Sequence, residues 1–156
     1  MSENIEKEYN ILVVKFSLPS FNKLNQEFEI SSIEKPDFLL RNIRRKMHEK
    51  LEFFSKTVES IIHPSGESIV SSYESDFFSD EEKNSLVSLH KKLLIFERRS
   101  SLLDIESSEE NEAIFINDLF NEWNNLKSSL KNVLNKLITG WTNESSDNES
   151  GGKYFG

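Results

Sequence analysis

The sequence predicts a mainly α-helical protein, with three long amphipathic helices packed as an antiparallel bundle. Apolar residues recur at steps of three and four over three long stretches, and residues typical of helix ends border each stretch. Only about four residues separate the second stretch from the third, which favours antiparallel neighbours. We expect an N-terminal extension over residues 1–35, the helical bundle over 36–141 and a flexible acidic tail over 142–156.

The N-terminal extension is compatible with two structures. The β-branched run Ile11–Val14 is typical of a strand, and apolar residues alternate with glutamates over residues 27–30, so a small β-hairpin is our first choice. A short helix over about residues 20–29 is nearly as well supported, because three apolar residues there fall at helical spacing. These residues are Phe21, Leu24 and Phe28.

The first long helix is predicted between Pro36 and Ile62. Proline suits the first turn of a helix, and Pro64 with Gly66 marks the end of the pattern. Seven apolar residues fall on one face, which predicts that this face is buried. They are Leu40, Ile43, Met47, Leu51, Phe54, Val58 and Ile61.

The second long helix is announced by a capping box at Ser79 and Glu82, in which hydroxyl and carboxylate each bond a backbone N–H at the helix start. An apolar face then continues to Leu103, where we expect the helix to end. The connector over residues 63–78 is long for a loop in a compact domain and contains several apolar residues. We expect it to pack on the bundle, with a short helical turn.

The third helix has the most regular pattern, beginning after a second capping box over residues 107–110. Gly140 is placed to end it. Its apolar strip is wider than the narrow seam of a two-stranded coiled coil, which favours a bundle core that contains Trp123. The strip comprises Ile116, Leu119, Trp123, Leu126, Leu130, Val133 and Leu137.

The composition excludes several classes of protein. A formal net charge of -8 disfavours generic attraction to nucleic acid or anionic lipid. The absence of cysteine removes disulfides and thiolate metal ligands, and the longest aliphatic run is far too short to span a bilayer. The N-terminus is acidic where a secretory signal would be basic, so we expect a cytoplasmic protein without membrane association.

Catalytic and metal-binding motifs are not recognisable. The histidines His48, His63 and His90 lie in different segments, and the zinc-protease pattern that starts at His48 fails because residue 52 is Glu. His48 and Glu52 could hold a metal across one helical turn, but we favour a solvated histidine. No glycine-rich phosphate loop is present. We therefore predict no catalytic residue, no cofactor, no metal and no enzymatic activity.

A basic stripe is predicted on the flank of the first long helix. Arg41, Arg44, Arg45 and His48 fall within about 100° of each other around the helix axis. The stripe could meet nucleic-acid phosphates or an acidic partner segment. We favour a structural role, in which these charges offset acids on neighbouring helices. The acids at the start of the third helix are Glu106, Glu109, Glu110 and Glu112.

The acidic tail ends on an aromatic pair, Tyr154 and Phe155. A polar spacer followed by two aromatic side chains suits a short docking motif, although the pair could also fold back on the domain. Trp141, just beyond Gly140, is placed either to cap the bundle or to serve as an exposed anchor.

These features predict a non-enzymatic interaction protein, adaptor or assembly subunit. A protein partner would bind through the helical bundle, the C-terminal tail or both. The alternative is a nucleic-acid-associated protein that uses the basic stripe. A homodimer is also compatible with the sequence, because a three-helix bundle can leave part of a wide apolar strip uncovered. The partner and pathway are not encoded in any motif that we recognise.

Overall fold

The fold is entirely helical over the part of the chain that can be described. The computed structural model describes the backbone of residues 2–151 and the side chains of residues 4–144. No β-strand is found within residues 2–151, which confirms the predicted fold class. The contacts divide the chain into two units, with Met1–Ser55 and Lys91–Asn124 in unit 1, and Lys56–His90 and Asn125–Gly156 in unit 2.

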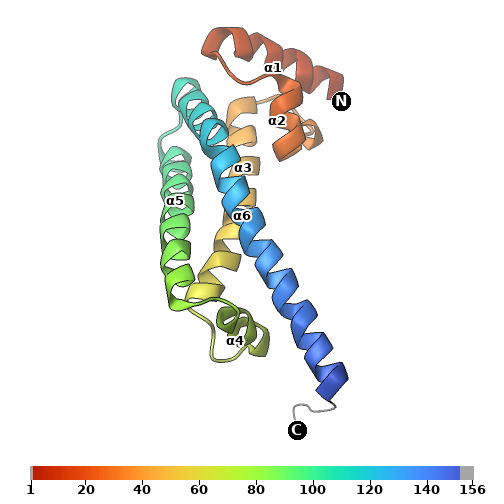
Figure 1. The fold of residues 1–156 in the computed structure, drawn as a ribbon. Helices are drawn as coiled ribbons and strands as arrows, with labels where there is room; N and C mark the ends of the chain where they lie inside the picture. The colour runs from red at the N-terminus through yellow and green to blue at the C-terminus, as the bar shows by residue number, and fades with distance from the viewer. Residues whose placement is uncertain (1, 152–156) are drawn as a thin grey trace. The chain divides into compact units, whose positions relative to one another are not determined.

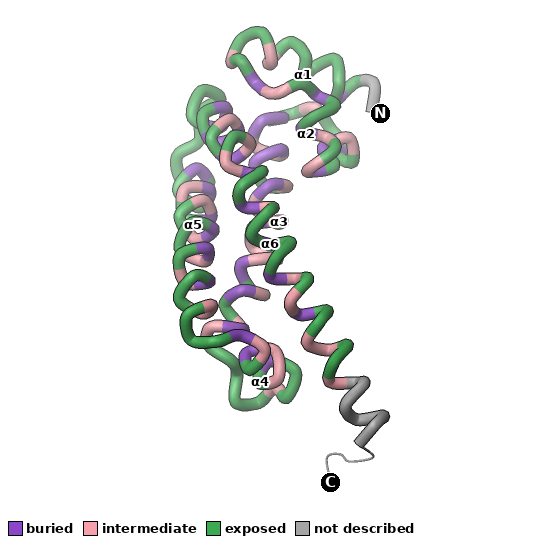
Figure 2. Tube along the Cα trace, in the orientation of Figure 1, coloured by how far each residue is buried: buried purple, intermediate pink, exposed green. Residues whose placement is uncertain are grey.

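The three predicted long helices are α3 (Leu39–Ile62), α5 (Asp80–Ile105) and α6 (Glu109–Gly151), and they pack together (Figure 1). Buried positions recur along one face of each helix (Figure 2). Six of the seven apolar residues predicted to be buried on α3 and all seven on α6 are buried; Phe54 is half-buried. Hydrophobic periodicity therefore located the core of the bundle correctly.

The N-terminal hairpin prediction is wrong. The segment forms α1 (Ser2–Phe16) and α2 (Phe21–Phe28), followed by one 3-10 turn (Ile30–Ser32), and the short-helix alternative is confirmed. The β-branched residues are part of helix α1. This helix is held in place by Ile5 and Tyr9, which are both fully buried. Burial of this helical face overrides the strand propensity of the run that follows.

Aromatic contacts hold α1 and α2 within unit 1. The Tyr9 hydroxyl donates to the Pro19 carbonyl at 2.7 Å, and burial raises the pKa of this phenol above its ordinary value. The Trp123 indole donates to Glu27 Oε2 at 2.9 Å, and its ring lies 5.0 Å from that of Phe28. Trp123 is buried, as predicted. These contacts place α2 against the first half of α6.

In unit 2 the connector forms a short helix, α4 (Ile69–Asp76), as the apolar residues in it suggested. Two of its serines donate to carbonyls at the end of α3: Ser71 bonds Ser60 at 3.0 Å and Ser75 bonds Ile61 at 2.7 Å. They satisfy backbone oxygens that have no partner within α3 itself. The connector therefore packs on the helix end through these serine hydrogen bonds, while the apolar side chains Ile69 and Val70 at the start of α4 are exposed.

The capping box at the start of α5 is present as predicted. Glu82 N–H donates to Ser79 Oγ at 3.1 Å, and Ser79 N–H donates to Glu82 Oε1 at 3.0 Å. The Glu82 carboxylate also accepts from Lys136 on α6. The hydrogen bond from Lys136, followed by the one from Ser79, lowers the pKa of Glu82 to about 2.

The prediction that Gly140 ends the third helix is wrong, because α6 continues through it to Gly151. Residues 142–151, expected in the flexible tail, are therefore helical, and the rest of the predicted tail lies outside the described residues. A Cβ at Gly140 would come within 2.6 Å of Phe77 Cε2. Glycine is used here for close approach of an aromatic ring rather than as a helix stop.

Replacing Glu82 by Gln should reduce stability only at pH values where Glu82 is ionised. Its pKa falls from an ordinary value of 4.5 to about 2 on folding, so its stabilising effect is complete above pH 4.5 and is lost as the pH falls toward 2. The melting temperatures of wild type and Glu82→Gln, measured against pH, should converge across this interval. Glu81→Gln, an exposed control on the same helical turn, should not show this convergence. A constant difference between wild type and Glu82→Gln at all pH values would contradict the assignment.

Gly140→Ala should destabilise the protein even though alanine is the better helix former. Overpacking against Phe77 costs about 1–3 kcal/mol, which exceeds the gain of about 1 kcal/mol in helix propensity. Gly66→Ala is the matched control, since a Cβ there meets nothing within 4 Å. Thermal melts should show a lower midpoint for Gly140→Ala alone. Higher stability of Gly140→Ala would show that Phe77 does not constrain this position.

Candidate functional site

A buried arginine organises the region of unit 1 where α3, α5 and α6 meet. Arg44 has 0% exposure and forms a two-point bond with Glu112, which is 1% exposed: Nε donates to Oε2 at 2.6 Å and Nη2 to Oε1 at 3.1 Å. Nη1 donates to the carbonyl and the hydroxyl of Ser100, both at 2.9 Å. Nη2 also donates to Asp104 Oδ1 at 2.8 Å. One side chain thus joins three helices.

The charges in this network stabilise each other. Burial alone would lower the pKa of Arg44, but its hydrogen bonds and charge attraction to Glu112 and Asp104 raise that pKa above the ordinary arginine value. The hydrogen bond from Arg44 holds the pKa of Asp104 below its ordinary value. Arg44 is therefore a structural cation with its donors engaged inside the protein.

The predicted basic stripe does not form one exposed surface. Arg44 is buried, because Glu112, one of the acids expected to offset the stripe, draws it into the core. Arg45 is exposed, and its Nε lies 3.3 Å from Asp104 Oδ1. The guanidinium carbon of Arg41 lies 4.8 Å from the centre of the Phe38 ring. His48, the fourth member, is directed to Glu52 instead, at 3.5 Å.

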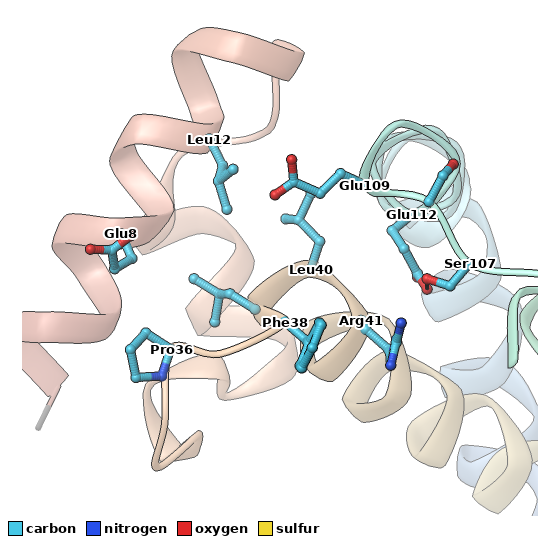
Figure 3. Close-up of a pocket in the computed structure, with 11 residues that line it drawn as sticks. Glu8, Leu12, Pro36, Phe38, Leu40, Arg41, Ser107, Glu109 and Glu112 are labelled. Atoms are coloured by element: carbon cyan, nitrogen blue, oxygen red, sulfur yellow. Dashed lines mark hydrogen bonds between the residues drawn. The ribbon is translucent and has the colours of Figure 1, made fainter.

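Next to this network lies a pocket of about 420 Å³, shown in Figure 3. Helix α1, the start of α3 and the start of α6 form its walls. Apolar side chains line one part, and carboxylates, hydroxyls and one guanidinium line the rest. The lining residues are Glu8, Leu12, Pro36, Phe38, Leu39, Leu40, Arg41, Ser107, Ser108, Glu109 and Glu112.

The rim of the pocket carries an exposed aromatic side chain on a strained backbone. Phe38 is 72% exposed and has φ of 50°, in the left-handed region that bulky residues avoid. Two hydrogen bonds from Asn42 fix this conformation, from its backbone N–H to the Phe38 carbonyl at 3.0 Å and from its amide to the Asp37 carbonyl at 2.9 Å. Phe38 therefore ends the preceding loop and leads into α3 with its ring directed to solvent.

Figure 3 shows the Glu109 side chain pointing toward Leu12 on α1, with Phe38 and Arg41 side by side at the rim. Glu109 also forms an exposed ion pair with Lys15 at 3.4 Å. Exposed pairs of this kind contribute little, roughly 0–1 kcal/mol, so the carboxylate can exchange this partner for another. The pocket thus offers an apolar wall and an accessible negative charge.

The hydroxyl groups in the pocket have structural partners. Ser107 donates to Glu112 Oε1 at 2.9 Å, and Ser108 caps α6 by accepting from the Asn111 N–H at 3.1 Å. The expected capping box over residues 107–110 is therefore replaced by a simple cap at Ser108. Both hydroxyls therefore have hydrogen bonds within the protein.

Of the predicted docking residues, Trp141 lies on the surface of unit 2. Its indole donates to Glu74 Oε2 at 2.9 Å, and its ring packs against Tyr73 and edge-on against Phe77. The side chain therefore packs on α4 and on the residue that follows it, and its role as a partner anchor stays a prediction. Tyr154 and Phe155 lie outside the described residues, so their role as a docking pair stays a prediction.

The seven predicted strip residues of α6 are buried within the chain. Exposed apolar side chains occur at Ile114 and Ile138 on the same helix, and on α5 at Ile95, Leu102 and Ile105. Those of α5 are spaced seven and three residues apart, which places them on one side of the helix. The homodimer stays a prediction.

The sequence pattern did not indicate the pocket or the exposed position of Phe38, because the first helix was expected to begin at Pro36. With α3 beginning at Leu39, Pro36 belongs to the preceding loop and Phe38 is the residue before the helix. The two residues between Pro36 and the first buried pair, Leu39 and Leu40, could have indicated that the helix begins after Pro36.

No helix within the described residues is both long enough and apolar enough to cross a membrane. In comparisons with protein-family models, curated proteins and solved structures, nothing matches the chain significantly.

Arg44→Met should destabilise the protein by about 3–5 kcal/mol, because it leaves Glu112 buried without its counter-charge. Arg45→Met is the matched control: it removes an exposed arginine that contacts the same Asp104 and should cost no more than about 1 kcal/mol. Urea unfolding followed by circular dichroism measures both. The double variant Arg44→Met, Glu112→Leu should recover part of the loss, since no unpaired charge remains. Equal small losses for both single arginine variants would contradict this role of Arg44.

Proposed function

We propose that this protein is a non-enzymatic interaction protein that holds a segment of a partner protein at the pocket of unit 1. Phe38 carries the proposal. Its exposed ring and strained backbone both disfavour the folded state, by roughly 1–3 kcal/mol for the backbone conformation alone. Aromatic side chains at the edge of a pocket are frequent anchors of protein interfaces.

The chemistry of the pocket suggests what the partner segment contains. Leu12, Leu40 and Pro36 offer an apolar wall, and Glu8 and Glu109 are exposed carboxylates in the same lining. An apolar side chain followed by lysine or arginine would match this arrangement. The net charge of -8 would further attract a basic segment.

A binding role is better supported than an enzymatic one. The Ser108 hydroxyl caps α6, and the Ser107 hydroxyl donates to Glu112. Both oxygens of the Glu112 carboxylate also accept from the buried Arg44, so this carboxylate is held in a structural ion pair. A carboxylate held in this way is a weak base, which disfavours activation of Ser107 as a nucleophile.

The nucleic-acid alternative has less support. It depended on a continuous stripe of arginines, and Arg44 is buried while Arg45 lies beside Asp104. Strong retention of DNA or RNA on a filter at low salt, lost at higher salt, would nevertheless favour this alternative over the proposal.

Phe38→Asn should weaken partner binding without lowering stability. Asparagine tolerates the left-handed region, so relief of strain offsets the lost stacking with Arg41, worth roughly 0.5–1 kcal/mol. The melting temperature should stay within about 3 °C of wild type or rise. Affinity capture from the native host, followed by titration of the purified partner, should show a loss of at least about tenfold in affinity.

Phe53→Asn is the control, because Phe53 is also an exposed aromatic residue, at 66%, and lies on α3 outside this pocket. It should capture the same partner as wild type. Undiminished binding by Phe38→Asn would remove the pocket from the proposal. Loss of binding on deletion of residues 143–156, with Phe38→Asn unaffected, would transfer the function to the C-terminal segment.

A further inference from the structure

A second cluster of charged side chains lies in unit 1, away from the pocket lining. His48 and Glu52 are one turn apart on α3, and Glu97 comes from α5. One nitrogen or oxygen atom from each side chain lies within 4.8 Å of the corresponding atoms of the other two. Sequence spacing identified the first two residues as a conceivable metal pair; the packing of α5 against α3 adds the third.

The cluster is largely enclosed by the protein. Glu97 is 6% exposed, and His48 is directed to Glu52 through Nε2, while its Nδ1 is buried without a hydrogen-bond partner within the described part of the chain. One oxygen of Glu52 lies within 4.8 Å of one oxygen of Glu97. Two carboxylates this close repel each other, and a cation between them would offset that repulsion.

We propose that His48, Glu52 and Glu97 bind a divalent transition-metal ion, of which Zn²⁺ is the first choice. The distance between His48 Nε2 and Glu52 Oε2 is 3.5 Å. Two ligand atoms on one tetrahedral Zn²⁺ ion are separated by roughly the same distance, given bonds of about 2.1 Å. One imidazole and two carboxylates suit Zn²⁺, Mn²⁺ or Fe²⁺ better than Mg²⁺, which prefers oxygen ligands alone.

The donor set also suggests a role for such an ion. Three protein ligands leave at least one coordination position for water. The ligands come from two helices, so the ion would join α3 to α5 within unit 1 as a cross-link. This inference is independent of the partner site, because none of the three residues lines that pocket.

The competing explanation is an ion pair between protonated His48 and the two carboxylates. The two explanations differ in what happens when Glu97 is made neutral. If a metal supplies the positive charge, metal-free Glu97→Gln should be as stable as wild type or more stable, because the repulsion between the carboxylates of Glu52 and Glu97 has been removed. If His48 supplies it, Glu97→Gln should be less stable with or without metal.

The test uses the full-length protein after treatment with a chelator, titrated with Zn²⁺, Mn²⁺ or Mg²⁺. Zn²⁺ should raise the melting temperature of wild type and bind with one equivalent per chain in competition with a chromophoric chelator. His48→Gln and Glu97→Gln should each lose at least about tenfold in Zn²⁺ affinity. Co²⁺ should give a visible absorption band with wild type that is altered in both variants.

Glu49→Gln is the matched control, since Glu49 is an exposed acid on α3 next to His48 and outside the cluster. It should bind Zn²⁺ as wild type does. Unchanged Zn²⁺ affinity in both His48→Gln and Glu97→Gln, or no Zn²⁺ binding by wild type, would overturn the proposal. So would a metal-independent loss of stability in Glu97→Gln, which would identify the cluster as an ion pair. None of these outcomes depends on whether Phe38 binds a partner.

Discussion

The buried pair of Arg44 and Glu112 is the interaction on which the arrangement of unit 1 depends. Burying two charges is costly unless each is fully compensated, and here the arginine bonds to Ser100 and Asp104 on α5 as well as to its counter-charge on α6. A shift of α3 or α6 by a turn would break the two-point bond, and a shift of α5 would break the bonds to Ser100 and Asp104. The pair therefore fixes the register of the three helices, whereas apolar contacts alone would tolerate sliding. Because Glu112 also accepts from Ser107, the same pair positions the start of α6, which forms one wall of the pocket.

Hydrophobic periodicity predicted the parts of the fold in which the local sequence pattern is compatible with only one structure. The apolar faces of α3 and α6 are buried as expected, since a helix of this length with one apolar side has few other stable arrangements. The hairpin prediction failed because strand propensity at Ile11–Val14 competes with burial of Ile5 and Tyr9, and packing decides. Gly140 failed as a helix stop because the local signal is identical whether glycine ends a helix or admits the ring of Phe77.

The candidate sites were less predictable, since each depends on residues distant in the sequence. Helical spacing placed Arg44 on the helix flank beside the apolar face, and nothing local to α3 shows that Glu112, 68 residues later, draws it inside. Glu97 could not be joined to His48 without knowing which turn of α5 faces α3. For Phe38 the obstacle was local: moving a predicted helix start by three residues changes a first-turn side chain into an exposed loop residue with positive φ.

Arg44 and Glu97 are charged side chains in the same unit that differ in their hydrogen bonds. All the hydrogen bonds that stabilise Arg44 come from groups on two other helices, α5 and α6, so this fold compensates a buried charge that has a structural role. Glu97 lies on the same helix as two of those groups, Ser100 and Asp104, yet its carboxylate has no comparable bond within the described residues. A carboxylate with no packing task would be replaced at little cost by glutamine or leucine. Its position beside His48 is therefore better explained by a cation that binds to the folded chain than by a role in folding.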